Sequence, residues 1–153
     1  KNEVSFNTKK FRHSFIDKLK LKFELAYGRL NYSKKLYLSD TIFQCKGNIN
    51  LLEEFPLLFF DCSVNSNKKN DFFNKFNIDT KKENKTFILN AKGNLSILNK
   101  KINFKEISID DNYKASSEDL YYFKENFENI LFNEDFAGIF NINKIREFIS
   151  EIL

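Results

Sequence analysis

The sequence predicts a mainly β (α+β) fold: an elongated, curved antiparallel sheet with an apolar inner face, followed by two C-terminal amphipathic helices. Apolar and polar residues alternate with a period of two in several stretches before residue 112. After residue 113 the apolar period changes to 3.6. Because the strands precede the helices instead of alternating with them, the pattern favours an antiparallel sheet over a parallel β–α–β arrangement.

The length of 153 residues suits a single domain. We expect a sheet region over residues 1–112 and a helical cap over 113–153. The chain begins with Lys1 and contains no methionine, so we expect it to be a segment of a longer protein. No apolar run approaches the roughly 20 residues that span a bilayer.

The clearest strand covers residues 18–27, where Leu19, Leu21 and Phe23 alternate with lysines. Turns are expected at 28–29 and 33–35, which leaves short strands at 30–32 and 36–39. Longer strands follow at 41–52, 57–64 and 86–98. The second of these is apolar on both faces over four residues, as in a central strand.

Two irregular features interrupt this series of strands. Residues 67–76 are ambiguous, and Asp71 could begin a short helix that carries Phe72, Phe73 and Phe76. A tight turn at 99–101 leads into a strand at 102–110. There the apolar parity shifts between Phe104 and Ile107, which predicts a β-bulge.

The phrase "CKGNINLLE" at 45–53 recurs as "AKGNLSILN" at 91–99. Each copy lies in the middle of a predicted strand, and each glycine takes an inward-facing position among large apolar residues. Glycine weakens a strand interior but permits a bend or the close approach of another group. We interpret the repeat as a duplicated β unit.

Two helices are expected at 117–132 and 142–153, separated by an interruption at 133–138. The run from Ser116 to Asp119 supplies an N-cap and an acidic first turn. We expect the two apolar stripes to pack on one end of the sheet and to leave the rest of its apolar face open. The stripes are Leu120, Phe123, Phe127, Ile130 and Leu131 in the first helix, and Ile142, Ile145, Phe148, Ile149 and Ile152 in the second.

No arrangement of residues indicates catalysis, so we expect a protein that is not an enzyme and needs no cofactor. His13 is the only histidine, which argues against histidine-based metal sites and against Ser-His-Asp machinery, and no metal site is expected. Asp110 and Asp111 are interpreted as turn residues, and Glu53 and Glu54 as the end of a strand. Cys45 and Cys62 are expected to be free thiols.

The charge pattern does not favour a nucleic-acid partner. The formal net charge of +4 comes from dispersed lysines, and only three arginines are present. Paired lysines such as Lys34-Lys35 are interpreted as solvated turns.

The number of strands exceeds what two helices can cover. A helix is roughly 10–12 Å wide and strands lie about 4.8 Å apart, so two helices shield about four strands. Six or seven strands are expected. The sheet could curl over itself or pair with a second sheet; otherwise its uncovered apolar face is available to a ligand or a neighbouring segment.

The segments "GNLSILNKKINFKEISIDDNYKASSEDLYYFKENFENILF" and "GIFNINKIREFISEIL" resemble the C-terminal region of AsmA-like proteins. This resemblance implies a periplasmic, elongated β groove of the bridge-like lipid-transfer type, which supports phospholipid transport or outer-membrane assembly. It also implies an inner-membrane anchor outside this segment, neighbouring β segments of the same longer chain, and envelope proteins as possible partners. No individual functional residue is implied.

Two functions follow as hypotheses. In the first, the chain is a lipid-handling segment whose apolar face holds phospholipid acyl chains. In the second, it is a structural or protein-interaction β module whose apolar face is an ordinary closed core. Alternation alone selects the candidate lipid-binding residues, which are Leu19, Leu21, Phe23, Leu25, Phe43, Ile49, Leu51, Phe87, Leu89, Leu95 and Ile97.

Overall fold

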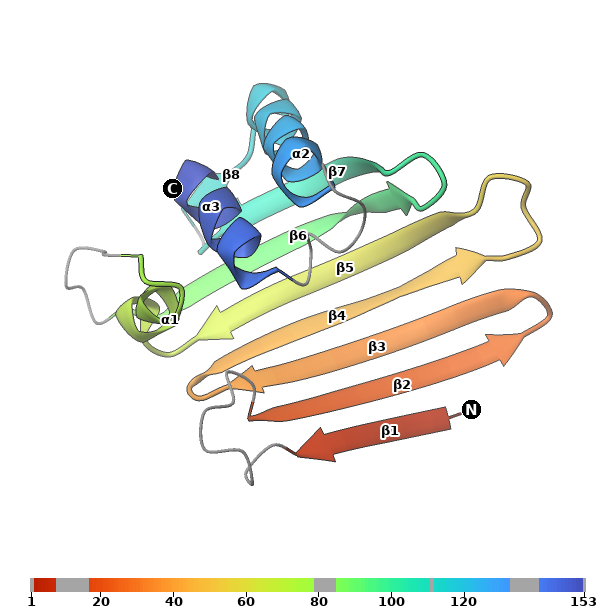
Figure 1. Cartoon of the computed structure of the whole chain (residues 1–153), viewed down its shortest axis with the longest axis horizontal. Helices are drawn as coiled ribbons and strands as arrows, with labels where there is room; N and C mark the ends of the chain where they lie inside the picture. Colours follow the sequence, from red (N-terminus) through yellow and green to blue (C-terminus); the bar gives the residue numbers. More distant parts are fainter. Residues whose placement is uncertain (1, 8–16, 79–84, 111, 133–140, 153) are drawn as a thin grey trace.

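The computed structural model of the chain describes residues 2–7, 17–78, 85–110, 112–132 and 141–152. Eight strands form one open antiparallel sheet in which spatial order equals chain order (Figure 1). The strands are β1 (Asn2–Asn7), β2 (Lys18–Ala26), β3 (Arg29–Leu38), β4 (Thr41–Asn50), β5 (Leu57–Ser66), β6 (Phe87–Ser96), β7 (Lys101–Ile109) and β8 (Tyr113–Lys114). The helices are α1 (Lys69–Lys75), α2 (Ser117–Leu131) and α3 (Ile142–Ile152).

The mainly β fold with C-terminal helices is therefore confirmed. The long strands lie where the alternation predicts them, and β5 is central because it pairs with β4 and β6. The predicted bulge is also present: the β6–β7 register shifts between Lys92 and Gly93, opposite residues 104–106. The α2 N-terminus carries a complete capping box, in which Ser116 and Asp119 each accept a hydrogen bond from the other's backbone amide.

The prediction of a turn at 33–35 is wrong, because β3 runs without a break from residue 29 to residue 38. Ten consecutive residues pair with β4 and nine with β2, so pairing on both sides holds Ser33, Lys34 and Lys35 extended. The turn expected at 28–29 is present one residue earlier, as the two-residue connection at Tyr27 and Gly28, whose φ angles of 51° and 73° are those of a tight hairpin turn. The sequence pattern did not predict β1 or β8.

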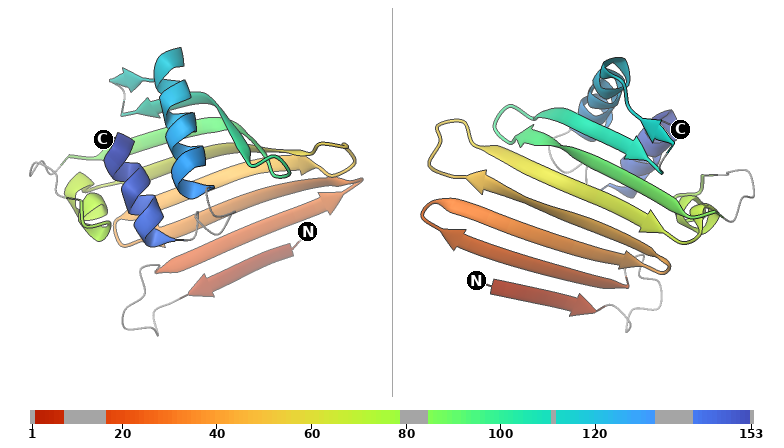
Figure 2. Two further views of the ribbon diagram at one scale, coloured as in Figure 1. Left: turned by 45° about the horizontal axis from the view of Figure 1, so that its top comes forward. Right: turned by 180° about the vertical axis from the view of Figure 1, so that it is seen from behind.

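The three helices gather near the β5–β7 end of the sheet, and α2 and α3 lie on the same face (Figure 2). Residues from β5, α1 and β6 form the main core cluster, and α3 contributes Ile145 and Ile149 to its edge. The most deeply buried large side chain of this cluster is Phe73, at 1% exposure. The core cluster consists of Val64, Phe72, Phe73, Phe76 and Phe87.

Phe127 of α2 makes the aromatic contacts that join both C-terminal helices to the sheet. Its ring packs edge-on against Phe104 of β7 at a centroid distance of 5.7 Å and against Phe148 of α3 at 5.5 Å. The predicted packing of the helices on one end of the sheet is confirmed. His13, Asp111 and the interruption at 133–138 lie outside the described residues.

Candidate functional site

The strand register separates the sheet into two chemically different faces. Across β2, β3 and β4 the register aligns Phe23 with Tyr32 and Tyr32 with Gly47. It continues through Phe60 to Gly93 and Phe104, so one face carries the inward set of every long strand. We call it the apolar face. The opposite, polar face carries residues such as Lys46, Asp61, Lys92 and Glu106.

The sequence predicts that the apolar residues of the strands beginning at 18, 41 and 86 lie on the same side of one continuous sheet. This prediction is confirmed for the residues that lie within strands. The β2, β4 and β6 sets align across β3 and β5, and a slip of one residue would have placed every apolar group in water. Tyr27, Leu51 and Ile97 lie in the connections instead.

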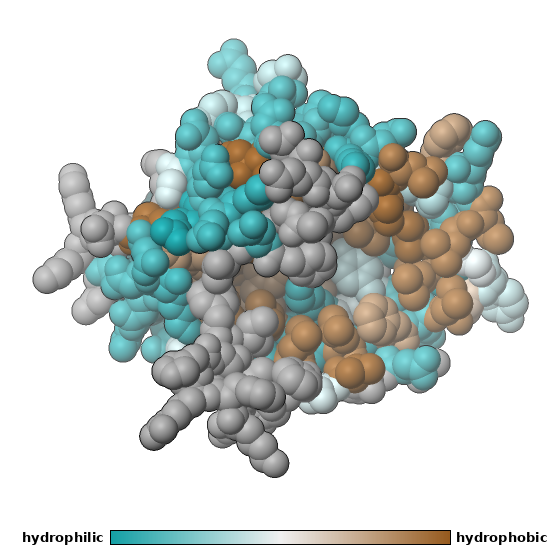
Figure 3. Space-filling model, in the orientation of Figure 1, coloured by the Kyte–Doolittle hydropathy of each residue, from teal (hydrophilic) through white to brown (hydrophobic). Residues whose placement is uncertain are grey.

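The helices cover only part of the apolar face. Near β5–β7 the face is closed, and Phe43, Leu89 and Ile109 pack against the core cluster. Near β1 and β2 it is exposed: the exposed fraction is 55% for Val4, 36% for Phe23 and 64% for Leu25. Together with half-buried Leu21, these residues form what we call the open strip. Figure 3 shows hydrophobic surface beside the helices on this side of the molecule.

The structure divides the sequence-predicted lipid-binding residues into three groups. Phe43, Phe87 and Leu89 lie in or against the core cluster, and Ile49 is separately buried. Leu51 and Ile97 are exposed in connections between strands, and Leu95 is half-buried on β6. Only Leu19, Leu21, Phe23 and Leu25 lie together on the less covered side, so alternation identified the face correctly but could not distinguish covered from open positions.

Aromatic rings occupy the space that the repeated glycines leave on the apolar face. A Cβ added at Gly47 would come within 2.8 Å of a Tyr32 ring carbon, and one at Gly93 within 2.8 Å of Phe60 Cζ. Tyr32 Oη also donates a hydrogen bond of 3.4 Å to the Phe59 carbonyl oxygen. The predicted inward glycines are confirmed. Each is closely approached by a carbonyl oxygen of one neighbouring strand and by an aromatic ring of the other.

A depression of about 430 Å³ lies beside the two glycines. Its lining combines residues with the parity of the apolar face, such as Tyr32 and Phe60, with charged residues that have the parity of the polar face. Two of its lysines already have acidic partners: Lys46 lies 3.6 Å from Asp61, and Lys92 lies 3.5 Å from Glu106. The lining residues are Tyr32, Lys46, Gly47, Asn48, Phe59, Phe60, Asp61, Lys92, Gly93 and Lys105.

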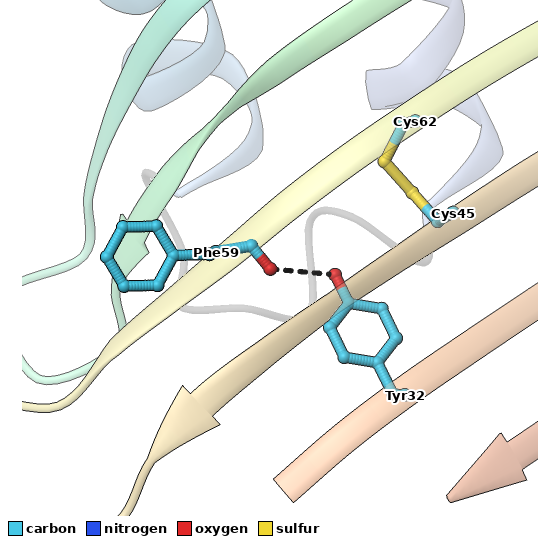
Figure 4. The surroundings of a disulfide bond; sticks show 4 residues. All are labelled: Tyr32, Cys45, Phe59 and Cys62. Atoms are coloured by element: carbon cyan, nitrogen blue, oxygen red, sulfur yellow. Dashed lines mark hydrogen bonds between the residues drawn. A yellow bond between two sulfur atoms is a disulfide. The ribbon is translucent and has the colours of Figure 1, made fainter. Parts of the chain in front are cut away.

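The prediction that both cysteines are free is wrong, because Cys45 and Cys62 form a disulfide (Figure 4). The β4–β5 register places them directly opposite each other, with their Cα atoms 4.1 Å apart. The sequence pattern had assigned them only to two separate strands. Their contact depends on register, which sequence spacing does not reveal.

Lys34 is a candidate ligand-binding residue that the sequence pattern did not reveal. The register places it on the apolar face, opposite Leu21 on one side and Cys45 on the other. It is half-buried, and burial lowers the pKa of its ammonium group because desolvation disfavours the charged form. The pair Lys34-Lys35 looked like a solvated turn, whereas in a continuous strand two adjacent residues must point to opposite faces.

One member of each acidic pair, Asp110 and Glu53, accepts a hydrogen bond in a connection between strands. Asp110 has a φ of 52° and accepts a hydrogen bond of 2.8 Å from the Ile88 amide, as expected of a turn residue. Glu53 accepts one from the Asn50 side chain at the end of β4. Within the described ranges, no group of three or more His, Cys, Asp or Glu side chains is placed to hold a metal ion.

The chain matches no protein-family model, no curated protein and no solved structure. In the part of the chain that the structure describes, no helix is both long enough and apolar enough to cross a membrane.

Proposed function

We propose that this chain is a non-enzymatic lipid-handling segment that receives acyl chains on the open part of its apolar face. The observation that carries this proposal is the incomplete cover of that face. Phe23 and Leu25 are 36% and 64% exposed on the same face whose other end is buried beneath the helices. Contiguous exposed apolar residues of this kind are typical of binding surfaces.

Burial of hydrocarbon would provide the binding free energy. Each acyl CH₂ group removed from water contributes about 0.8 kcal/mol. Movement of a lipid along the strip would exchange one apolar contact for another and would need no chemical step. The headgroup would remain at the solvated edge of the sheet.

The resemblance to AsmA-like proteins supports a role for this activity in phospholipid transport or outer-membrane assembly. On this proposal the segment is periplasmic and is anchored to the inner membrane by a part of the protein outside this sequence. Neighbouring β segments of the same longer chain, and envelope proteins, would be its protein partners. The Cys45–Cys62 disulfide supports an oxidising compartment, because disulfides persist there and are rare in the cytosol.

A structural or protein-interaction module is the second candidate, and the edge strand β1 favours it. Among the described strands, β1 pairs only with β2 and is the first strand of the open sheet. An unpaired edge can accept a strand from another segment through backbone hydrogen bonds. In that case another part of the partner, packed on the apolar face beside the added strand, would cover the open strip instead of a lipid.

The two candidate functions are distinguished by whether phospholipid co-purifies with the protein. Phe23→Glu and Leu25→Glu place a charge on the open strip, and Asn48→Glu places one at an exposed position of the polar face. We expect mass spectrometry of organic extracts to find phospholipid with the native protein and with Asn48→Glu. Both strip variants should fold, as judged by circular dichroism, but lose the lipid.

Leu89→Glu provides the structural comparison because Leu89 packs against the core cluster, so this variant should unfold. If the native protein carries no lipid and Phe23→Glu unfolds as Leu89→Glu does, the face is ordinary core. That result would reject the lipid-handling proposal in favour of the interaction module.

A further inference from the structure

Lys34 is the one charged side chain on the apolar face among the described residues of strands β2–β7. The register assigns to this face leucines, phenylalanines, isoleucines and small residues, with Tyr32, Thr41 and Ser66 as its other polar side chains. Six of the other described lysines have the parity of the polar face, and Lys101, the first residue of β7, pairs with Glu128 of α2. The six are Lys18, Lys20, Lys22, Lys35, Lys46 and Lys92. A lysine at this position therefore needs a physical explanation beyond the general abundance of lysine in the chain.

The described residues around Lys34 offer its ammonium group no anion. Its Nζ lies 5.8 Å from the centroid of the Phe43 ring, and no described carboxylate lies within ion-pairing distance of it. Its direct cross-strand neighbours are Leu21 and the disulfide-bonded Cys45. A half-buried cation without an ion-pair partner is costly, and an anionic group brought by a ligand would offset that cost.

We propose that Lys34 binds the anionic group of an acyl amphiphile whose hydrocarbon chain lies along the open strip. This inference rests on the proposed function and makes it more specific: the ligand carries a carboxylate or phosphate next to its acyl chain. Charge complementarity selects the ligand, since the rest of the strip offers only apolar contacts.

The geometry allows both contacts at once. Lys34 lies opposite Leu21, and from there the apolar face of β2 continues through Phe23 to Leu25. At about 3.3 Å per strand residue, the path from residue 21 to residue 25 is about 13 Å long. The exposed fraction rises along this path, from half-buried Leu21 to 36% for Phe23 and 64% for Leu25. The anionic end of the ligand would thus be held at the more covered end of the strip.

An alternative role for Lys34 is to prevent the exposed face from stacking on another sheet, and this role predicts a different result. A charge on the face opposes such stacking, because stacking would bury the charge without a partner, and this protection requires no ligand. A protective lysine would not distinguish a charged amphiphile from a neutral one of the same shape. Selectivity for the anion is therefore the property to measure.

The experiment compares dansylaminoundecanoic acid, an acyl chain with a terminal carboxylate, with its methyl ester by fluorescence titration. The proteins are the native chain, Lys34→Met, Lys34→Arg and the polar-face control Lys35→Met. One charge-assisted hydrogen bond corresponds to about a tenfold difference in affinity. We expect the native chain and Lys35→Met to bind the acid about tenfold more tightly than the ester. Lys34→Met should bind the two equally, and Lys34→Arg should restore the preference.

Two results would overturn the inference, and they differ in what they say of the proposed function. If all four proteins bind acid and ester with equal affinity, the strip holds acyl chains but Lys34 does not select the anion. If no protein binds either probe, the lipid-handling proposal fails and the inference fails with it. Circular dichroism checks that each variant is folded. If Lys34→Met is unstable, Lys34→Arg still tests the inference, because it should keep the preference for the acid.

Discussion

Glu128 of α2 accepts a hydrogen bond of 2.9 Å from the backbone amide of Ile102 in β7. Its other carboxylate oxygen accepts one of 2.7 Å from Lys101 Nζ. Only 8% of the Glu128 side chain is exposed, whereas Lys101 is largely in solvent. The carboxylate also raises the pKa of Lys101, through the hydrogen bond first and through charge attraction second. One side chain thus fixes the helix to the sheet.

Removal of this carboxylate should destabilise the fold. Glu128→Ala leaves the Ile102 amide without its acceptor, and we expect a loss of about 1–3 kcal/mol in the free energy of unfolding. Glu128→Gln keeps an acceptor oxygen and should lose less. Urea denaturation followed by circular dichroism measures both. Glu147→Gln, at an exposed position of α3, is the control, and an equal effect there would contradict the assigned role.

The two repeated glycines should tolerate alanine poorly. A Cβ at Gly47 would overlap the Phe59 carbonyl oxygen, and one at Gly93 would overlap that of Asn103. Backbone atoms cannot move aside cheaply, so each Gly→Ala variant should lose about 1–3 kcal/mol. Alanine in an unconstrained strand would instead stabilise the fold by roughly 0.5–1 kcal/mol. A lower urea midpoint in the Gly→Ala variants would confirm the steric overlap, and a higher midpoint would contradict it. Asn48→Ala is a neighbouring control.

The disulfide between Cys45 and Cys62 should contribute to stability and be visible by mass. Alkylation of the unfolded, unreduced protein should modify neither cysteine, and alkylation after reduction should modify both. Because the bond joins residues 17 positions apart, its removal should cost about 3 kcal/mol on the chain-entropy account. The variant for urea denaturation is the double change Cys45→Ala with Cys62→Ala. Two reactive thiols in the unreduced protein would contradict the assignment.

The capping box of α2 predicts a pH-dependent term in stability. The Asp119 pKa is lowered by hydrogen bonds from the Ser116 amide first, and then from the Ser116 and Tyr113 hydroxyl groups. A carboxyl whose pKa is lower in the folded state stabilises that state above its unfolded pKa of about 3.9. This stabilisation is lost as the pH falls through the folded value. Asp119→Asn should therefore melt below the native protein at pH 7, and the difference should shrink below about pH 4. A difference independent of pH would argue against an ionised cap.

The sequence by itself determined the long strands β2 and β4–β7, their faces and the C-terminal helices α2 and α3, because each depends on local order. Alternation with a period of two assigns Leu19 and Phe23 to one face whatever their neighbours are. The capping residues Ser116 and Asp119 lie three positions apart, so the start of α2 was readable as well. The bulge near Phe104 was predictable for the same reason, since a parity shift is visible within one strand.

The tertiary structure decided what depends on pairing between distant segments. Strand register places Cys45 opposite Cys62 and thereby forms the disulfide. Pairing on both sides extends β3 through residues 33–35, which places Lys34 among apolar side chains instead of in a turn. Helix docking buries Phe87 and leaves Leu25 exposed, although the two residues have the same parity. Register and docking are set by contacts between residues far apart in the chain, and no local pattern contains that information.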